Sequence, residues 1–204
     1  MSTQTFDLST LLELRQDPPR AGQWAGERRR ADFGSHTLIR ATLERPAPAD
    51  VAIERGEDVL ELDHLPEASA WRAGDHVMVA IEPGDDAACQ RYVAWLLDLR
   101  DLPDRCSLAP WSRQPGGTAR LWAIAVARLV LPAHVRVEAR HDLVGIRLAQ
   151  IALAFGADTL AGPITPDRQL PVAGVTRPTE ATLAGLRNLI EQAGLEPTFE
   201  EHTP

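Results

Sequence analysis

The pattern of apolar and polar positions is clearest between residues 118 and 163. From 118 to 131, apolar residues recur three and four positions apart with alanines between them, so a largely buried helix is expected here. Pro132 is expected to end that helix. Residues 135–139 then alternate between apolar and polar side chains, which predicts a short strand.

A second helix and a second strand follow this first pair. Residues 146–155 are strongly apolar and begin directly after Gly145. Gly156 stands where helices commonly need a residue at positive φ, so it is expected to close this helix. Residues 160–163 predict a short buried strand that ends in a turn. Such alternation of helix and strand is typical of a parallel α/β layer or barrel.

The N-terminal part of the chain shows a different pattern. Residues 5–17 predict a helix that Pro18 ends. Residues 20–32 are polar and are expected to form a connector. Its arginine run, 28–30, is interpreted as a solvated face, with phosphate or carboxylate binding as the alternative. Three strands with little helix are expected next: 36–45, 51–53 and 59–62.

The middle of the chain supplies the link between these two parts. A strand is expected over 77–81 and a helix over 85–99, capped by the aspartates at its start. Residues 106–111 predict the next strand. The segment 112–117 contains two consecutive glycines and predicts a loop.

Together these elements predict an α/β protein, with a partial TIM-barrel-like parallel α/β layer and a strand-rich N-terminal extension. The extension is expected over residues 1–70, the barrel-like region over 71–199 and a tail over 200–204. The extension either enlarges the sheet or forms a separate lobe. A complete barrel takes on the order of 250 residues, more than the 204 of this chain. Open edges and an apolar inner face are therefore expected to be covered by a homo-oligomer or by a larger protein.

Charge and hydropathy narrow the classes of partner. The formal net charge is −8 and the sequence pI is near 5.2, which argues against a general nucleic-acid binder. No apolar run approaches the length that spans a bilayer, and the N-terminus lacks a signal-peptide pattern. These features predict a cytoplasmic protein without a membrane partner.

The candidate ligand-binding residues are polar side chains at the C-terminal ends of two predicted strands. They are Arg113, Gln114, Glu138, Arg140, His141 and Asp142. In a barrel that end carries the functional loops. Glu138 and Arg140 share a strand face, so they can make an internal ion pair across the sheet interior. No catalytic residue and no metal ligand is assigned, because no nucleophile–base pair and no metal-ligand spacing is present.

Three sequence segments carry a family resemblance: IAVARLVL, GIRLAQIALAFGAD and VAGVTRPTEATLAGLRNLIEQAGLEP. They resemble the C-terminal part of the radical S-adenosylmethionine enzymes of the aminofutalosine synthase, dehypoxanthine-futalosine cyclase and deazaflavin synthase group. The resemblance covers roughly residues 76–199. It implies all or part of a TIM-like barrel, and, in its active members, radical chemistry at an iron–sulfur cluster.

The cysteines do not fit that chemistry. Such an enzyme holds its cluster through three thiolates, normally in a Cys-x-x-x-Cys-x-x-Cys loop after the first strand. Only Cys89 and Cys106 are present, and the motif is absent. We therefore expect no iron–sulfur cluster, and a non-catalytic, degenerate relative that acts as a partner or ligand-binding subunit. The resemblance points to menaquinone (futalosine) biosynthesis.

Two alternatives remain open. One is a cluster-free enzyme whose site lies at the strand-end loops. The other is an FAD-binding subunit of an oxidoreductase, because residues 57–97 loosely resemble the opening of the FAD-binding domain of glycolate-oxidase-like flavoproteins. The Gly-rich pyrophosphate loop of that domain is missing from the residues that follow.

Overall fold

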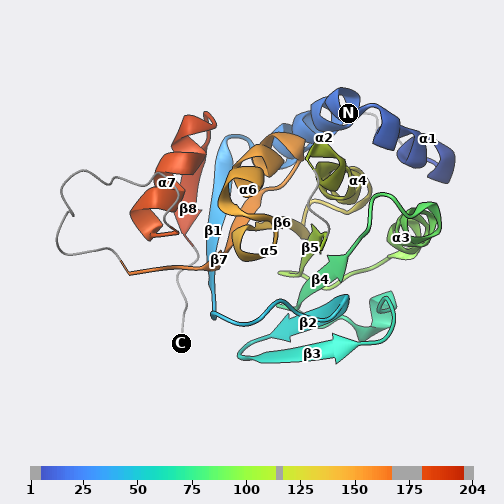
Figure 1. Cartoon of the computed structure of the whole chain (residues 1–204), viewed down its shortest axis with the longest axis horizontal. Coiled ribbons are helices and arrows are strands. Elements are labelled where there is room, and N and C mark those ends of the chain that lie inside the picture. Colours follow the sequence, from blue (N-terminus) through green and yellow to red (C-terminus); the bar gives the residue numbers. More distant parts are fainter. Residues whose placement is uncertain (1–5, 114–116, 167–180, 200–204) are drawn as a thin grey trace.

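The computed structural model describes residues 6–113, 117–166 and 181–199, and its strands form a single curved sheet with helices packed against it (Figure 1). The strands are β1 (His36–Thr42), β2 (Val51–Arg55), β3 (Asp58–Leu62), β4 (His76–Ala80), β5 (Ser107–Trp111), β6 (Arg136–Arg140), β7 (Thr159–Pro163) and β8 (Glu196–Phe199). Their order in the sheet is β3-β2-β4-β5-β6-β7-β1-β8. All neighbours from β4 to β8 are parallel, whereas β2 is antiparallel to both β3 and β4. The predicted α/β class and the unclosed, barrel-like parallel layer are confirmed.

The helices alternate with the parallel strands, as in other α/β layers. They are α1 (Leu8–Glu13), α2 (Pro18–Phe33), α3 (Asp86–Asp98), α4 (Leu121–Val130), α5 (His141–Val144), α6 (Ile146–Ala152) and α7 (Leu183–Gln192). Short 3-10 helices lie at Leu14–Gln16, Ala68–Ala70, Thr118–Arg120 and Leu153–Phe155. In the described part of the chain, no helix combines the length and the apolar character needed to cross a membrane.

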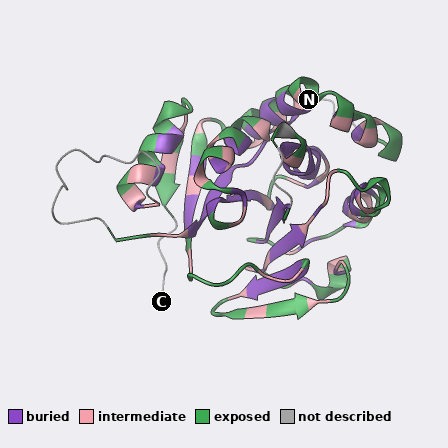
Figure 2. Cartoon of the chain, in the orientation of Figure 1, coloured by how far each residue is buried: buried purple, intermediate pink, exposed green. Residues whose placement is uncertain are grey.

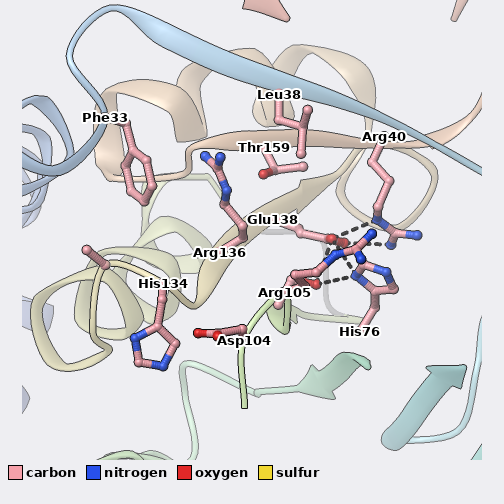
Figure 3. Close-up of a pocket in the computed structure, with 12 residues that line it drawn as sticks. Phe33, Leu38, Arg40, His76, Asp104, Arg105, His134, Arg136, Glu138 and Thr159 are labelled. Carbon is pink, nitrogen blue, oxygen red and sulfur yellow. Dashed lines mark hydrogen bonds and ion pairs between the residues drawn. The ribbon is translucent and has the colours of Figure 1, made fainter. Parts of the chain in front are cut away.

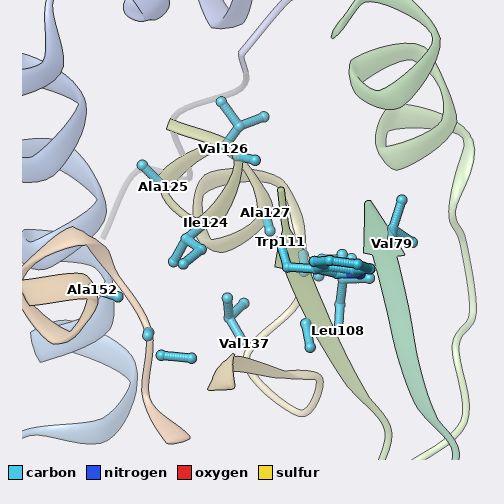
Figure 4. Close-up of a cluster of buried hydrophobic side chains, with 14 of the residues drawn as sticks. Val79, Leu108, Trp111, Ile124, Ala125, Val126, Ala127, Val137 and Ala152 are labelled. Atoms are coloured by element: carbon cyan, nitrogen blue, oxygen red, sulfur yellow. The ribbon is translucent and has the colours of Figure 1, made fainter. Parts of the chain in front are cut away.

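Helix α4 forms the centre of the core, as its apolar pattern predicts. Every residue from Leu121 to Leu129 is buried, and the helix packs against α2, β5 and β6 (Figure 2). Ile124 and Ala127 face the sheet side chains Leu108 and Val137 in the apolar cluster of Figure 4. The helix ends at Val130, and its C-cap Leu131 is extended, as expected for the residue directly before Pro132.

The strands of the N-terminal extension belong to the same sheet as the rest. β1 lies between β7 and β8, and β2 lies beside β4. The hairpin of β2 and β3 therefore ends the sheet at one side, and β8 ends it at the other (Figure 1). Residues from the extension thus reach the interior that the later strands surround.

The polar segment 20–32, expected to be a connector, is instead helical. Pro18 and Pro19 begin α2, since proline lacks only an N–H that the first turn leaves unpaired. Asp17 caps this helix by accepting the Arg20 N–H. The buried face of α2 carries small residues, so its helical period was hidden in a polar composition: Ala21, Gly22, Ala25 and Gly26.

The arginine run is also not a uniformly solvated face, because Arg29 is buried. Its guanidinium donates to Ala157 O at 3.0 Å, to His36 O at 2.6 Å and to Thr37 Oγ1 at 2.6 Å. These acceptors lie at the starts of β1 and β7. Arg29 therefore joins α2 to two neighbouring strands, which the sequence run alone did not indicate.

The C-terminal region contains the expected helix α7 and a strand, β8, that the sequence did not predict. Helix α7 is capped by Thr182, whose Oγ1 accepts the Gly185 N–H at 3.0 Å. Thr179, the cap suggested by the sequence, lies outside the described residues. Strand β8 then pairs in parallel with β1.

Candidate functional site

The inner face of the curved sheet is charged, although an apolar face was expected. Barrels of this kind are normally filled by layers of branched apolar side chains. Here the interior holds a series of alternating charges from β1, β2, β6 and helix α5, which follows β6 directly. We call this series the central ion chain: Asp142, Arg140, Glu54, Arg40 and Glu138.

Arg40 joins two carboxylates of the central ion chain. Its guanidinium holds Glu138 through two hydrogen bonds of 2.7 and 2.8 Å, and donates to Glu54 Oε1 at 2.6 Å. Strands β4, β5, β6 and β7 lie between β1 and β2 in the sheet order, yet Arg40 and Glu54 are in contact. The sheet must therefore curl around the interior so that its distant strands meet through side chains.

Arg140 extends the central ion chain toward the C-terminal end of β6. It donates to Glu54 Oε2 at 3.0 Å, and it holds Asp142 through two hydrogen bonds of 2.9 and 2.7 Å. Glu138 and Arg140 are both ion-paired in the interior, as the sequence indicated. Their partners are not one another: Glu54 and Arg40 stand between them.

Burial and neighbouring charges shift the pKa of Glu138 in opposite directions. Burial alone would raise the pKa of its carboxyl, but the Arg40 guanidinium and then His76 hold that pKa well below its usual range. Glu138 also accepts a 2.7 Å hydrogen bond from Ser107 Oγ. The pKa of Arg40 is correspondingly raised by its two carboxylates, against the opposing effect of burial. Both side chains are therefore charged inside the protein, an arrangement that seldom adds stability over apolar packing.

The central ion chain connects two cavities. The C-terminal cavity, of about 370 Å³, is bounded by the loop after β1, the β2–β3 hairpin, β4 and the end of β6. It is lined by Arg45, Pro46, Ala47, Pro48, Glu54, Val59, Glu61, Met78, Arg140 and Asp142.

The N-terminal cavity, of about 440 Å³, lies at the starts of β4, β5, β6 and β7 (Figure 3). It is lined by Phe33, Leu38, Arg40, His76, Asp104, Arg105, Ser107, Ala133, His134, Arg136, Glu138 and Thr159. Glu138 and Arg40 contribute to this cavity, and Arg140 and Asp142 contribute to the other. Each end of the ion chain thus faces a space that a small molecule can enter.

Of the remaining candidate residues, Arg113 and His141 line neither cavity. Arg113 is exposed, pairs with Asp50 at 3.0 Å and lies 5.2 Å over the Trp111 ring. Gln114 lies outside the described residues. His141 is buried with its ring against Gly162, and its Nε2 has no hydrogen-bond partner in the described part of the chain.

Sequence reasoning missed the interior residues that come from early strands. Arg40 and Glu54 are charged positions within apolar strand sequences, TLIRAT and VAIER. His76 is the first residue of β4. The available signal was a charged residue on the buried face of an otherwise apolar strand. The sequence does not show, however, which strands surround the same interior, because that depends on the fold.

The cysteines do not fit an iron–sulfur cluster. The loop after β1, where the resemblance would place three cysteines, reads LERPAPAD. Cys89 is buried in α3 and Cys106 is buried directly before β5; burial raises the pKa of both thiols. Over the described ranges, no group of three or more His, Cys, Asp or Glu residues is placed to hold a metal ion. We therefore derive no chemistry through a cluster.

The curved α/β sheet therefore carries an ion chain and two cavities in its interior. A similar solved structure is that of methylornithine synthase (PylB), a radical S-adenosylmethionine enzyme, with a TM-score of 0.53 and 15% sequence identity. The match covers 94% of this chain and 93% of that one. It supports the radical-SAM-like fold but not the futalosine group in particular. No protein family and no curated protein matches the sequence.

Proposed function

We propose that this protein is a non-catalytic, cluster-free relative of the radical S-adenosylmethionine fold that binds a small molecule in the C-terminal cavity. The observation that carries the proposal is the end of the central ion chain in that cavity, where Asp142 holds Arg140 on the wall. A concave space with a few convergent charged groups and apolar walls is the usual form of a small-molecule site.

The lining indicates the chemistry of the ligand. Acidic side chains outnumber basic ones, and Glu54 and Asp142 are already bound to arginines. Glu61 accepts only a 3.3 Å hydrogen bond from the Ala49 N–H among the described residues. The prolines of the loop after β1, with Val59 and Met78, supply apolar contact. A ligand with an amino or other cationic group and an apolar portion suits this lining.

The role of a partner subunit belongs to the same proposal. The sequence resemblance to the futalosine enzymes supports a place beside that chemistry in menaquinone synthesis, with this chain supplying binding rather than catalysis. The missing cysteines support the non-catalytic assignment. A cytoplasmic location is the one that such a role requires.

Native mass spectrometry of the protein purified from its own host, with an absorbance scan, tests this function. We expect a colourless species that carries a small molecule or a partner protein. Glu61→Gln should lose the small molecule, while Asp98→Asn, an exposed charge change on α3, should retain it. A yellow species with bound flavin would favour the FAD-binding alternative. A small molecule retained equally by both variants would remove the C-terminal cavity from the proposal.

A further inference from the structure

The N-terminal cavity has chemistry of its own that the proposed function does not use. It lies at the strand ends that usually serve stability in barrel proteins. Among the described candidate residues from the sequence, only Glu138 contributes to it. Figure 3 shows the side chains of His76, Arg105, His134 and Arg136 around this one space.

The hydrogen bonds around His76 determine where its proton lies. Ser107 Oγ donates to Glu138 Oε1 at 2.7 Å, and therefore accepts from His76 Nδ1 at 2.6 Å. Glu138 Oε1 itself lies 3.1 Å from the same nitrogen. In neutral His76 these contacts hold the proton on Nδ1 and leave the lone pair on Nε2. No described residue hydrogen-bonds to Nε2, and the side chain is 20% exposed on the cavity wall.

Two arginines supply positive charge to the same space. Arg105 is exposed, and its guanidinium has no ion-pair or hydrogen-bond partner among the described residues. Its φ of 63° lies in the left-handed region, which is uncommon for a residue other than glycine and often accompanies function. Arg136 stacks over the Phe33 ring at 4.6 Å and uses one nitrogen for Asp158 at 3.2 Å. Its other N–H groups remain free to bind a ligand.

The acidic groups of the lining do not neutralise both arginines. Glu138 is engaged by Arg40 within the ion chain. Asp104 is exposed at the rim beside Arg105 and makes no ion pair within the described ranges. The free groups of the cavity are thus the Arg105 guanidinium, part of the Arg136 guanidinium, the His76 Nε2 acceptor and, at the rim, the Asp104 carboxylate.

We propose that the N-terminal cavity is a second binding site, for a small metabolite that carries both an oxyanion and a hydroxyl group. Arg105 and Arg136 bind the carboxylate or phosphate oxygens, and His76 Nε2 accepts the hydroxyl hydrogen. Guanidinium groups suit oxyanions because their planar N–H donors match the geometry of two oxygens. The hydroxyl is required because Nε2, unprotonated in this tautomer, is a hydrogen-bond acceptor. A ligand that carries only oxyanions has no hydrogen to donate to it.

Two matched probes, malate and succinate, test the site in the full-length protein, because they differ only by one hydroxyl. Long-range ¹H–¹⁵N NMR should show His76 in the Nδ1–H tautomer and its Nε2 signal shifting on addition of malate. Malate should bind about tenfold more tightly than succinate, the effect of one hydrogen bond. Inorganic phosphate, used as a third probe, distinguishes a phosphate site from a carboxylate site.

Two arginine variants test the site without relying on the His76 NMR signal. Arg105→Gln, at an exposed position, should weaken malate binding about tenfold through the loss of one charge-assisted contact. Arg91→Gln, an exposed arginine of α3 away from the cavity, should leave it unchanged. Absence of any His76 shift with all three probes, or equal binding by the wild type and Arg105→Gln, would overturn the proposal. Loss of ligand from the C-terminal cavity would not overturn this proposal, because the two cavities share no lining residue.

Discussion

At the scale of single residues, Glu138 is the most consequential member of the ion chain. It is fully buried and receives hydrogen bonds from Arg40 and Ser107. Glu138→Gln removes the charge that compensates Arg40, so we expect the free energy of unfolding to fall by about 3 kcal/mol. Urea denaturation measures this. Asp50→Asn, which breaks the exposed pair with Arg113, is the control and should leave the stability nearly unchanged.

His141 predicts a pH dependence. Burial first, and Arg140 to a smaller extent, lower its pKa, while Asp142 acts in the opposite direction. The unfolded side chain titrates near 6.5, so between that value and the lower folded pKa the unfolded state binds more protons. Stability should therefore be complete above pH 6.5 and decline as the pH falls through the folded pKa.

His141→Gln should remove this part of the decline. Denaturant unfolding of both proteins at a series of pH values from about 7.5 to about 5, which bracket the ordinary histidine pKa, gives the comparison. Parallel curves for the two proteins would show that His141 does not cause the dependence.

Gly162 provides the space that His141 occupies. A Cβ at this position would lie 2.3 Å from His141 Nε2, and the residue's φ of 149° is one that side-chain-bearing residues rarely adopt. Gly162→Ala should lower the free energy of unfolding by about 2–4 kcal/mol, from the steric clash and the backbone strain together. Gly84→Ala has open space and an ordinary φ, so it should be nearly neutral. Adding His141→Ala should recover part of the loss, since the two residues are in contact.

At the scale of elements, the close packing of α2 rests on its glycines. A Cβ at Gly26 would lie 3.0 Å from Ala154 O, in the 3-10 helix Leu153–Phe155. Gly26→Leu should therefore push the two elements apart and lower the free energy of unfolding by about 1–3 kcal/mol, even though leucine favours helices. Gln23→Leu places the same side chain on the exposed face of α2 and is the control. Equal stability of the two variants would contradict the packing role.

Elements differ in how far the sequence predicts them. α3 and α4 could be predicted because their signals are local: Asp85 caps the first, and the second is apolar throughout. Gly156 adopts φ 97°, as its position after an apolar helix suggests. α2 was missed because its buried face consists of glycine and alanine, which composition does not distinguish from a polar connector.

At the scale of the whole molecule, the two edges of the sheet bear on the expected oligomer. Among the described residues, β3 and β8 each pair with another strand on one side only, and Leu60 and Phe199 on them are 42% and 40% exposed. Edge strands promote association unless charge or proline prevents it, and Pro197 in β8 limits backbone pairing there. We therefore propose that self-association, if no larger partner covers the sheet, uses the β3 side.

Sedimentation velocity over a range of concentrations tests this proposal. Leu60→Lys should weaken the self-association, because it places a charge on the exposed edge. Leu43→Lys, at a more exposed position that lies off the edge strands, should not. A monomer at every concentration, with no partner recovered from the host, would contradict the expectation of an oligomer.

The sequence by itself determined the α/β class and most of the parallel strands, because strand and helix periods are set by near neighbours. For the same reason it placed the polar residues Glu138, Arg140 and Asp142 at the C-terminal end of a strand. Tertiary structure alone decided that β1 enters between β7 and β8, and that Arg40 meets Glu138, 98 positions away. It also decided that the inner face is charged and that His76 faces a cavity. Such contacts depend on how the sheet curls, and a side chain's local sequence carries no information about the distant strand that it will face.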